Sequence, residues 1–238
     1  MDEEEMFEEL ETKKSAFQEQ KKSSNFKGGG KFNANPMWDS TDFTPKKIVL
    51  ANLKKEGDSF TVFTHEQVPE DVRERFLKAA KGLKSKGYTF RHNGEKADEV
   101  QNGILAIEDI KIESYLPWKK FNDNIKDPKV TIPTKDAYNI AFSYNGKLDK
   151  LPPAVRTIIA TQVECLLDNT LTNPCDIILS YSKEGHEHYK VGNEWVSWSS
   201  LGKLKFVYQI AEAANIAIFN LSKDDAIERL VEYLKSKN

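Results

Sequence analysis

The apolar residues divide the chain into two parts. Up to about residue 44 they stand singly among charged and small polar residues, as in KKSSNFKGGGKFNANP. A segment of this composition cannot bury a core, so we predict a flexible charged arm over residues 1–44. Apolar blocks begin after Pro45, and residues 45–238 are expected to form a single folded domain.

Short apolar blocks in this second part predict β-strands. IVLANL and FTVFT are bounded by Gly57 and Pro69, as strands are, and YTF and KIESYLPW predict two further strands. CDIILSY and NIAIFNL are nearly unbroken apolar runs. Such runs are typical of strands that are buried on both faces of a sheet.

Helical spacing of apolar residues separates these strands. Helices are predicted at EDVRERFLKAAKGLKSKG, over 96–107 and 154–168, and at SLGKLKFVYQIAEAAN and KDDAIERLVEYLKSK, with a short one at TKDAYNIAF inside a loop-rich insertion at about 119–153. KEGHEHYKVGNEW reads as a strand or hairpin. Parallel strands need long crossover connections, so this alternation predicts an α/β fold: a Rossmann-like parallel sheet with helices on both faces.

Composition excludes several classes of protein. No stretch approaches the roughly 18 apolar residues that cross a bilayer, and the acidic start differs from a signal peptide. We therefore expect a cytoplasmic protein without a membrane partner. Cys165 and Cys175 fit neither a disulfide framework nor a CxxC metal motif. His186 and His188 have HxH spacing without an evident third ligand, so neither a metal nor a cofactor is predicted.

The charges are unevenly distributed. Residues 1–11 hold seven of the 37 acidic residues and no base, which leaves 30 acidic residues against 35 basic ones elsewhere. Residues 12–47 hold eight lysines against Glu19, Asp39 and Asp42, an excess of five positive charges. The positive excess outside the acidic start therefore lies in the arm.

Aromatic residues are interleaved with the lysines of the arm. Lysines neutralise phosphates and release counterions, while planar side chains stack on bases, so this composition favours DNA, single strands especially. The predicted nucleic-acid-binding residues are Lys13, Lys14, Lys21, Lys22, Phe26, Lys27, Lys31, Phe32, Trp38, Lys46 and Lys47. Alternatively, aromatic residues such as Phe43 staple the arm onto the domain or onto a neighbouring subunit. The acidic stretch 1–11 is a solvated tail, or competes for the basic arm, or pairs with a neighbour's arm in a homo-oligomer.

Two turns carry the residues of a candidate phosphate or ligand site. In folds of this type ligands bind beyond the carboxyl ends of the strands, where glycine lets the backbone approach phosphate. The candidate residues are His65, Arg91, His92, Asn93, Gly94, Lys96, Asp98, Ser199, Ser200, Gly202 and Lys203.

Several motifs together carry a family resemblance. GYTFRHNGEKADE, SYLPWKKFN, NPCDIILSY and SSLGKLKFVYQIAEAANIAIFNL occur in this order, and the likeness covers about residues 60–222. They resemble the Rossmann-like nucleotide-binding proteins of the SLOG superfamily, which includes the DNA-processing protein A fold and the lysine-decarboxylase-like phosphoribohydrolases. The branch that it most resembles reads GYTLRSGGAxGAD, then IYLPWxxFN, then a GGT turn that opens a helix ending in IPVFNL. Many small members are encoded by phages, so the resemblance implies that this protein is also encoded by a phage.

The chain departs from this pattern at both glycine turns. His92-Asn93 stand where the family has its first double glycine, and Ser199-Ser200-Leu201 stand where it has GGT. Side chains at these places are expected to narrow or fill the ligand pocket, and the glutamate-bearing catalytic signature is not recognisable. We therefore predict a DNA-binding protein rather than an enzyme, using the basic arm and a converted SLOG-like scaffold. The alternative is a nucleotide or nucleotide-derivative binding protein with phosphoribohydrolase-like activity.

Overall fold

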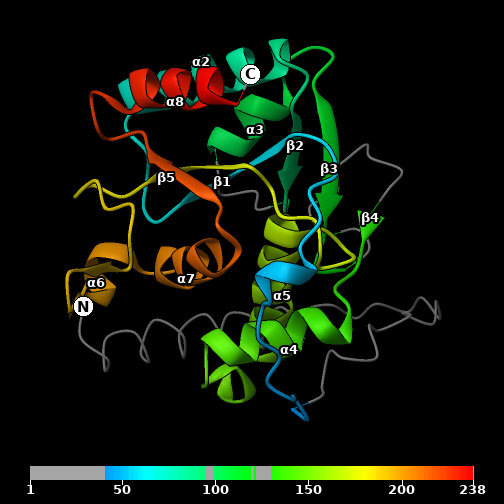
Figure 1. Ribbon diagram of the computed structural model, residues 1–238. Helices are drawn as coiled ribbons and strands as arrows, with labels where there is room; N and C mark the ends of the chain where they lie inside the picture. The colour runs from blue at the N-terminus through cyan, green and yellow to red at the C-terminus, as the bar shows by residue number, and fades with distance from the viewer. Residues whose placement is uncertain (1–40, 95–98, 119–120, 122–129, 238) are drawn as a thin grey trace, which may run out of the picture. The chain divides into compact units, whose positions relative to one another are not determined.

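Six parallel strands form one sheet in the order β4-β3-β2-β1-β5-β8 (Figure 1). The strands are β1 (Ser59–Thr64), β2 (Thr89–His92), β3 (Lys111–Tyr115), β4 (Val130–Thr131), β5 (Ile177–Tyr181) and β8 (Ala217–Asn220). This computed structural model describes residues 41–94, 99–118, 121 and 130–237. The prediction of a Rossmann-like α/β arrangement is confirmed.

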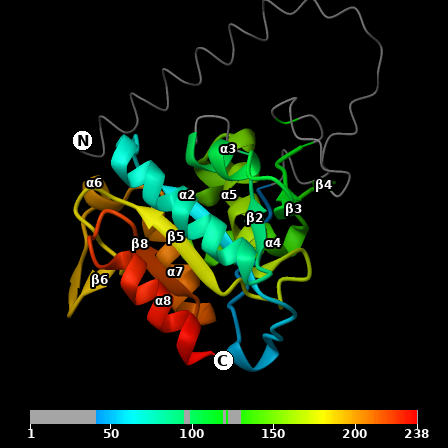
Figure 2. The same ribbon diagram turned by 90° about the horizontal axis from the view of Figure 1, so that it is seen from above.

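Helices cover both faces of the sheet (Figures 1 and 2). One face packs against α2 (Glu70–Ser85), α3 (Glu99–Leu105) and α8 (Ala226–Ser236). The other packs against α5 (Pro153–Leu167) and α7 (Leu204–Ala214), and α4 (Lys135–Tyr144) lies against α5. The apolar spacing that predicted α2 is the face that it buries: Val72, Phe76, Ala79, Ala80 and Leu83.

Alternate residues of the central strands feed two separate apolar clusters. In β1, Phe60 and Val62 pack with α2, α3 and α8, whereas Phe63 packs on the opposite side. In β5, Leu179 and Ile178 divide in the same way. Each fully buried side chain of this size contributes about 1.5–3 kcal/mol, so strands with two apolar faces are strongly held at the centre.

The IVLANL block is not a strand, and that prediction was wrong. Leu50–Asn52 form a short 3-10 turn, and the amide of Leu53 donates to the carbonyl of Leu50 at 3.0 Å. Ile48 and Leu53 pack against the core, while Val49 and Leu50 remain 51% and 57% exposed. Both edges of β1 are already paired, with β2 and β5, so the block has no place beside the strand that follows it.

Of the predicted loop-rich insertion at 119–153, the described residues from 130 onward contain a strand and a helix. The predicted helix TKDAYNIAF is confirmed as α4, whose first turn is capped by the hydroxyl of Thr134. The edge strand β4 was not expected. The single helix predicted at SLGKLKFVYQIAEAAN is divided into α6 (Trp198–Leu201) and α7, because the backbone turns at Gly202 with φ of +45°.

The strand order reverses beside β1. From β1 the chain moves outward through β2, β3 and β4, and then returns to place β5 on the other side of β1. The carboxyl ends of β1 and β5 therefore form the point where folds of this type bind ligands. Within the described ranges, no helix is long and apolar enough to cross a membrane.

Candidate functional site

The switch point between β1 and β5 brings together residues of three segments. His65 follows β1, Glu184 and His186 follow β5, and the serines of α6 begin the next helical segment. Hydrogen bonds connect these segments. Of the residues predicted for the ligand site, the structure brings His65 together with Ser199 and Gly202.

His65 occupies the surface of Gly202. A Cβ atom on Gly202 would lie 2.1 Å from the imidazole Cε1 of His65, and the ring nitrogen Nε2 lies 3.1 Å from the carbonyl oxygen of Ser199. Glycine is required here because a side chain of the same protein packs on its backbone. The close approach that the sequence suggested for a phosphate is thus made by an imidazole.

Hydroxyl groups cluster beside His65. The Oγ of Ser197 lies 2.8 Å from the Oγ of Ser199 and 2.8 Å from that of Ser200, and the amide of Ser200 donates to Ser197 Oγ at 3.2 Å. The Ser200 hydroxyl and His186 lower the pKa of the exposed Glu184 carboxyl. His186 Nε2 lies 2.8 Å from Glu184 Oε2. The cluster offers hydroxyl groups and a carboxylate at the surface, a set suited to polar, hydroxyl-bearing ligands.

Arg91 belongs to the interior. Its side chain is 2% exposed; Nε donates to Glu113 Oε2 at 2.9 Å and Nη1 to the carbonyl of Asn173 at 2.8 Å. Because Asn173 lies ahead of β5, these bonds tie β2, β3 and the entry to β5 together. Arg91 thus holds the sheet and is directed away from its carboxyl edge.

His92 and Asn93 are also buried. Nε2 of His92 lies 2.7 Å from Ser114 Oγ on β3, and Gln101 Nε2 donates to Asn93 Oδ1 at 3.1 Å. The side chains of His92 and Asn93 are therefore part of the packing between β2, β3 and α3. Gly94 has φ of +72°, and Lys96 and Asp98 lie outside the described residues.

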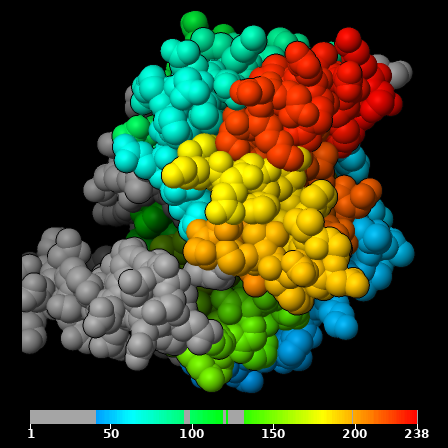
Figure 3. Space-filling view, turned by 90° about the vertical axis from the view of Figure 1, so that its left-hand side faces the viewer, coloured from blue at the N-terminus to red at the C-terminus, as the bar shows by residue number. Residues whose placement is uncertain are grey.

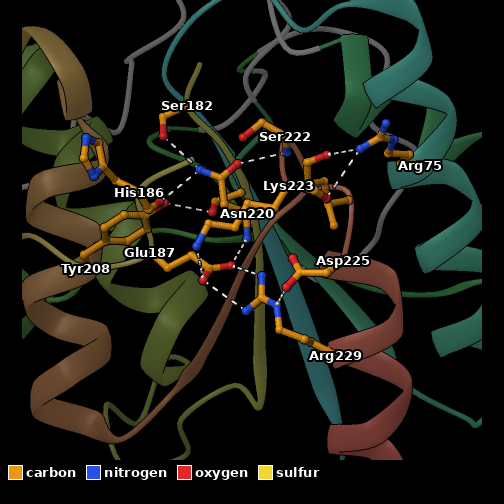
Figure 4. Close-up of polar contacts among 12 residues, drawn as sticks. Arg75, Ser182, His186, Glu187, Tyr208, Asn220, Ser222, Lys223, Asp225 and Arg229 are labelled. Carbon is orange, nitrogen blue, oxygen red and sulfur yellow. Dashed lines mark hydrogen bonds and ion pairs between the residues drawn. The ribbon is translucent and has the colours of Figure 1, made fainter. Parts of the chain in front are cut away.

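A buried polar network fixes the start of the connection after β5 (Figure 4). Nδ2 of Asn220 donates to Ser182 Oγ at 2.8 Å and to the carbonyl of His186 at 2.9 Å, and Tyr208 Oη also donates to that carbonyl. Glu187 binds Arg229 Nη2 at 2.7 Å, Lys223 Nζ at 3.0 Å and the amide of Asn220 at 2.8 Å. Residues 182–187 are thereby anchored to β8 and α8.

The same connection then forms an exposed antiparallel hairpin. β6 (Lys190–Val191) and β7 (Glu194–Trp195) pair in the register Lys190 with Trp195, which confirms the predicted hairpin. Figure 3 shows the connection spread over one face of the molecule in yellow and orange, below α8 in red. Trp195 is 55% exposed. Its side chain was not among the candidates, although the Gly192-Asn193 pair within KVGNEW is a signal for a hairpin tip.

Most of the predicted arm residues lie outside the described residues: Lys13, Lys14, Lys21, Lys22, Phe26, Lys27, Lys31, Phe32 and Trp38. Lys46 pairs with Asp136 at 2.6 Å, and Lys47 is exposed. Phe43 is buried and its ring stacks on Tyr138, with centroids 5.7 Å apart and planes 5° apart. At Phe43 the aromatic side chain staples the chain to α4, as the alternative interpretation proposed.

Neither cysteine nor histidine assembles a metal site in the part of the chain that is described. No group of three or more His, Cys, Asp or Glu side chains there has metal-binding geometry. Cys165 and Cys175 are both buried, and burial raises the pKa of the Cys175 thiol to about 12. A thiol in that state is a poor nucleophile.

Comparisons with known proteins found no match: no family model, no curated protein and no solved structure is significantly similar to this chain.

Proposed function

We propose that this protein binds DNA and does so through its surface rather than through a nucleotide pocket. The observation that carries the proposal is the packing of His65 on Gly202, where an added Cβ would lie 2.1 Å from the imidazole. Phosphate recognition at such a turn needs the backbone open to the ligand. Here the protein's own side chain takes that place.

Charge and resemblance support the same function. Residues 12–47 carry eight lysines against three acidic residues, with aromatic residues between them. Lysines at this density bind phosphates by counterion release. The motifs resemble those of the SLOG superfamily, which includes the DNA-processing protein A fold. This resemblance supports DNA binding by analogy of fold only, because it does not extend to the residues of a binding site. Encoding by a phage and assembly of several copies along the strand belong to the same proposal.

Nucleotide binding is the second candidate. The switch point carries Glu184, His186 and three serine hydroxyls near the surface, and carboxylates in folds of this type bind ribose hydroxyls. This function requires His65 to leave Gly202 when the ligand binds.

Fluorescence anisotropy over a salt series separates the two functions. Full-length protein is titrated into labelled single-stranded and double-stranded oligonucleotides, and separately into a labelled mononucleotide. DNA binding that weakens steeply with salt supports the proposal, because neutralised phosphates release counterions. The absence of binding to either DNA at low salt overturns it. Mononucleotide binding that is insensitive to salt supports the second candidate instead.

Charge variants of the full chain locate the binding lysines. Replacing Lys21, Lys22, Lys27 and Lys31 by Gln should flatten the salt dependence by about 0.7 per lost phosphate contact on a single strand. A matched variant carries Gln at four exposed lysines outside the arm. These are Lys78 and Lys81 in α2, Lys86 directly after α2, and Lys235 in α8. Equal effects of both sets would contradict binding through the arm.

A further inference from the structure

The β6–β7 hairpin holds a large aromatic side chain at the surface. Gly192 has φ of +61° at the first position of the two-residue turn, which matches a type II′ hairpin. The amide of Val196 donates to the carbonyl of Tyr189 at 3.0 Å and closes the base of the hairpin. Trp195 therefore projects from a defined backbone.

Two lysines and a tyrosine surround the indole ring of Trp195. Lys190 Nζ lies 4.1 Å and Lys205 Nζ 5.0 Å from its centroid, and the Tyr189 ring lies 5.5 Å away at an angle of 40°. Tyr189 itself packs against the core. These three side chains position the indole, and Trp195 as a whole remains 55% exposed.

The charges beside Trp195 favour an anionic partner. Lys190 and Lys205 form no ion pair with a carboxylate among the residues that the structure describes. Two carboxylates lie nearby: Glu194, next to Trp195 in β7, and Glu212, which raises the pKa of Tyr189. Ammonium groups held 4–5 Å from an aromatic ring can bind a phosphate while the ring contacts the attached base.

We propose that Trp195 is a base-stacking platform for single-stranded nucleic acid and that Lys190 and Lys205 bind the phosphates on either side of the stacked base. This inference rests on the proposed DNA-binding function and deepens it by naming the strand form. In a duplex both faces of each base are covered by its neighbours, whereas every base of a single strand offers a free face to an aromatic side chain.

The buried network keeps this platform in position. The carbonyl of His186 accepts bonds from Tyr208 Oη and Asn220 Nδ2, three residues ahead of Tyr189. Lys205 projects from the first turn of α7. The platform is therefore built from two anchored segments, which lowers the entropy lost on binding.

Anisotropy titrations of full-length variants test the platform with labelled oligothymidine and with a duplex of the same length. Trp195→Ala should weaken oligothymidine binding about 5- to 150-fold, the range for loss of one stacked base, and change duplex binding little. Trp195→Phe should retain most of the affinity. Lys190→Gln with Lys205→Gln should flatten the salt dependence, and Glu194→Gln should strengthen binding.

Matched controls separate this platform from general effects. Val231→Ala truncates another exposed apolar side chain, on α8, and Lys235→Gln removes an exposed lysine of the same helix; both should bind as the wild type does. If the wild type binds and Trp195→Ala binds equally well, the platform is wrong while the DNA-binding function stands. If the wild type binds neither form of DNA, both proposals fail.

Sedimentation of the same variants tests a different occupant of the surface. A wild type that self-associates and a Trp195→Ala variant that is monomeric with unchanged DNA affinity would assign the surface to a second copy and overturn the platform. An unchanged oligomeric state together with weakened oligothymidine binding supports it. Should Trp195→Ala fold poorly, the double variant Lys190→Gln with Lys205→Gln preserves the test, because an unchanged salt dependence in that variant would also contradict the platform.

Discussion

Glu187 and Glu164 are both buried carboxyl groups, yet their pKa values shift in opposite directions. Burial alone would raise the pKa of Glu187, but Arg229, the amide of Asn220 and Lys223 outweigh it and hold the pKa below its ordinary value. Burial raises the pKa of Glu164 to about 7, and the amide and hydroxyl of Thr134 oppose it only in part. Glu164 Oε2 has no hydrogen-bond partner within the described residues.

The difference shows that partners, and not depth alone, decide whether a buried carboxylate is stabilised. Glu187 has cationic partners on its carboxylate and fixes the connection that leads to the hairpin. Glu164 is the more deeply buried of the two and has one bonded oxygen in α5. The two sites should therefore respond to pH and to neutral substitution in opposite ways.

The largest expected effect is that of Glu187→Gln. Neutralising the partner of Arg229 and Lys223 should lower the free energy of unfolding by about 3 kcal/mol near pH 7, below the upper end for buried pairs because both cations are partly exposed. Because the pKa of Glu187 is lowered in the folded state, its carboxylate stabilises the fold at pH values above the ordinary pKa of 4.5. This stabilisation is lost as pH falls through the lowered pKa. Urea unfolding should therefore show the wild-type and variant stabilities converging in acid.

Glu164→Gln should have the opposite sign. The folded-state pKa of about 7 exceeds the ordinary 4.5, so wild-type stability should be greatest below 4.5, fall as pH rises to 7, and stay reduced above. The glutamine keeps the acceptor for the Thr134 amide and removes the charge, so it should gain about 2 kcal/mol near pH 8. The free energy of unfolding of both proteins should be measured between pH 4.5 and 8. A variant less stable than the wild type near pH 8 would contradict the comparison.

The packing of His65 on Gly202 involves no ion pair, so its stability effect can be compared with those of the two carboxylates. Gly202→Ala should cost about 1–2 kcal/mol, because the new Cβ displaces His65 and alanine resists a positive φ. Combining it with His65→Ala should recover only the steric part, so the two substitutions should be non-additive in thermal unfolding. Additive losses would show that His65 does not pack on this glycine.

The smallest stability effect is expected at the hairpin. Trp195→Ala should change the free energy of unfolding by less than about 0.5 kcal/mol, since the side chain is mostly exposed. Differential scanning fluorimetry would measure it beside Val231→Ala. A loss of several kcal/mol would show that Trp195 serves the fold rather than a surface function.

The sequence predicted the sheet better than it predicted the site. The spacing of apolar residues and the length of each apolar block predicted α2, α4, β5 and β8, because burial on one or two faces leaves a regular apolar pattern. The strand prediction at IVLANL was wrong because a short apolar block does not show whether a neighbouring strand has a free edge with which it could pair. The strand order likewise depends on contacts between segments distant in the chain.

The sequence placed His65, Ser199 and Gly202 among the candidate ligand residues, and the structure brings them together, but the sequence did not show that His65 packs on the glycine. Arg91, His92 and Asn93 were assigned to a ligand turn, whereas the structure places their side chains inside the fold. A residue at the end of a strand can point into the packing or beyond the edge, and the sequence alone does not distinguish the two. Trp195 was missed because its exposure and the approach of Lys205 depend on how the hairpin packs against α7, and its pairing with Lys190 depends on the hairpin register.

The most direct test of the DNA-binding proposal is the salt dependence of oligothymidine binding by the full-length wild type. The account predicts a slope of log affinity against log salt steeper than about −2, which corresponds to about three neutralised phosphates on a single strand. The absence of binding at low salt, or binding that salt leaves unchanged, would contradict it.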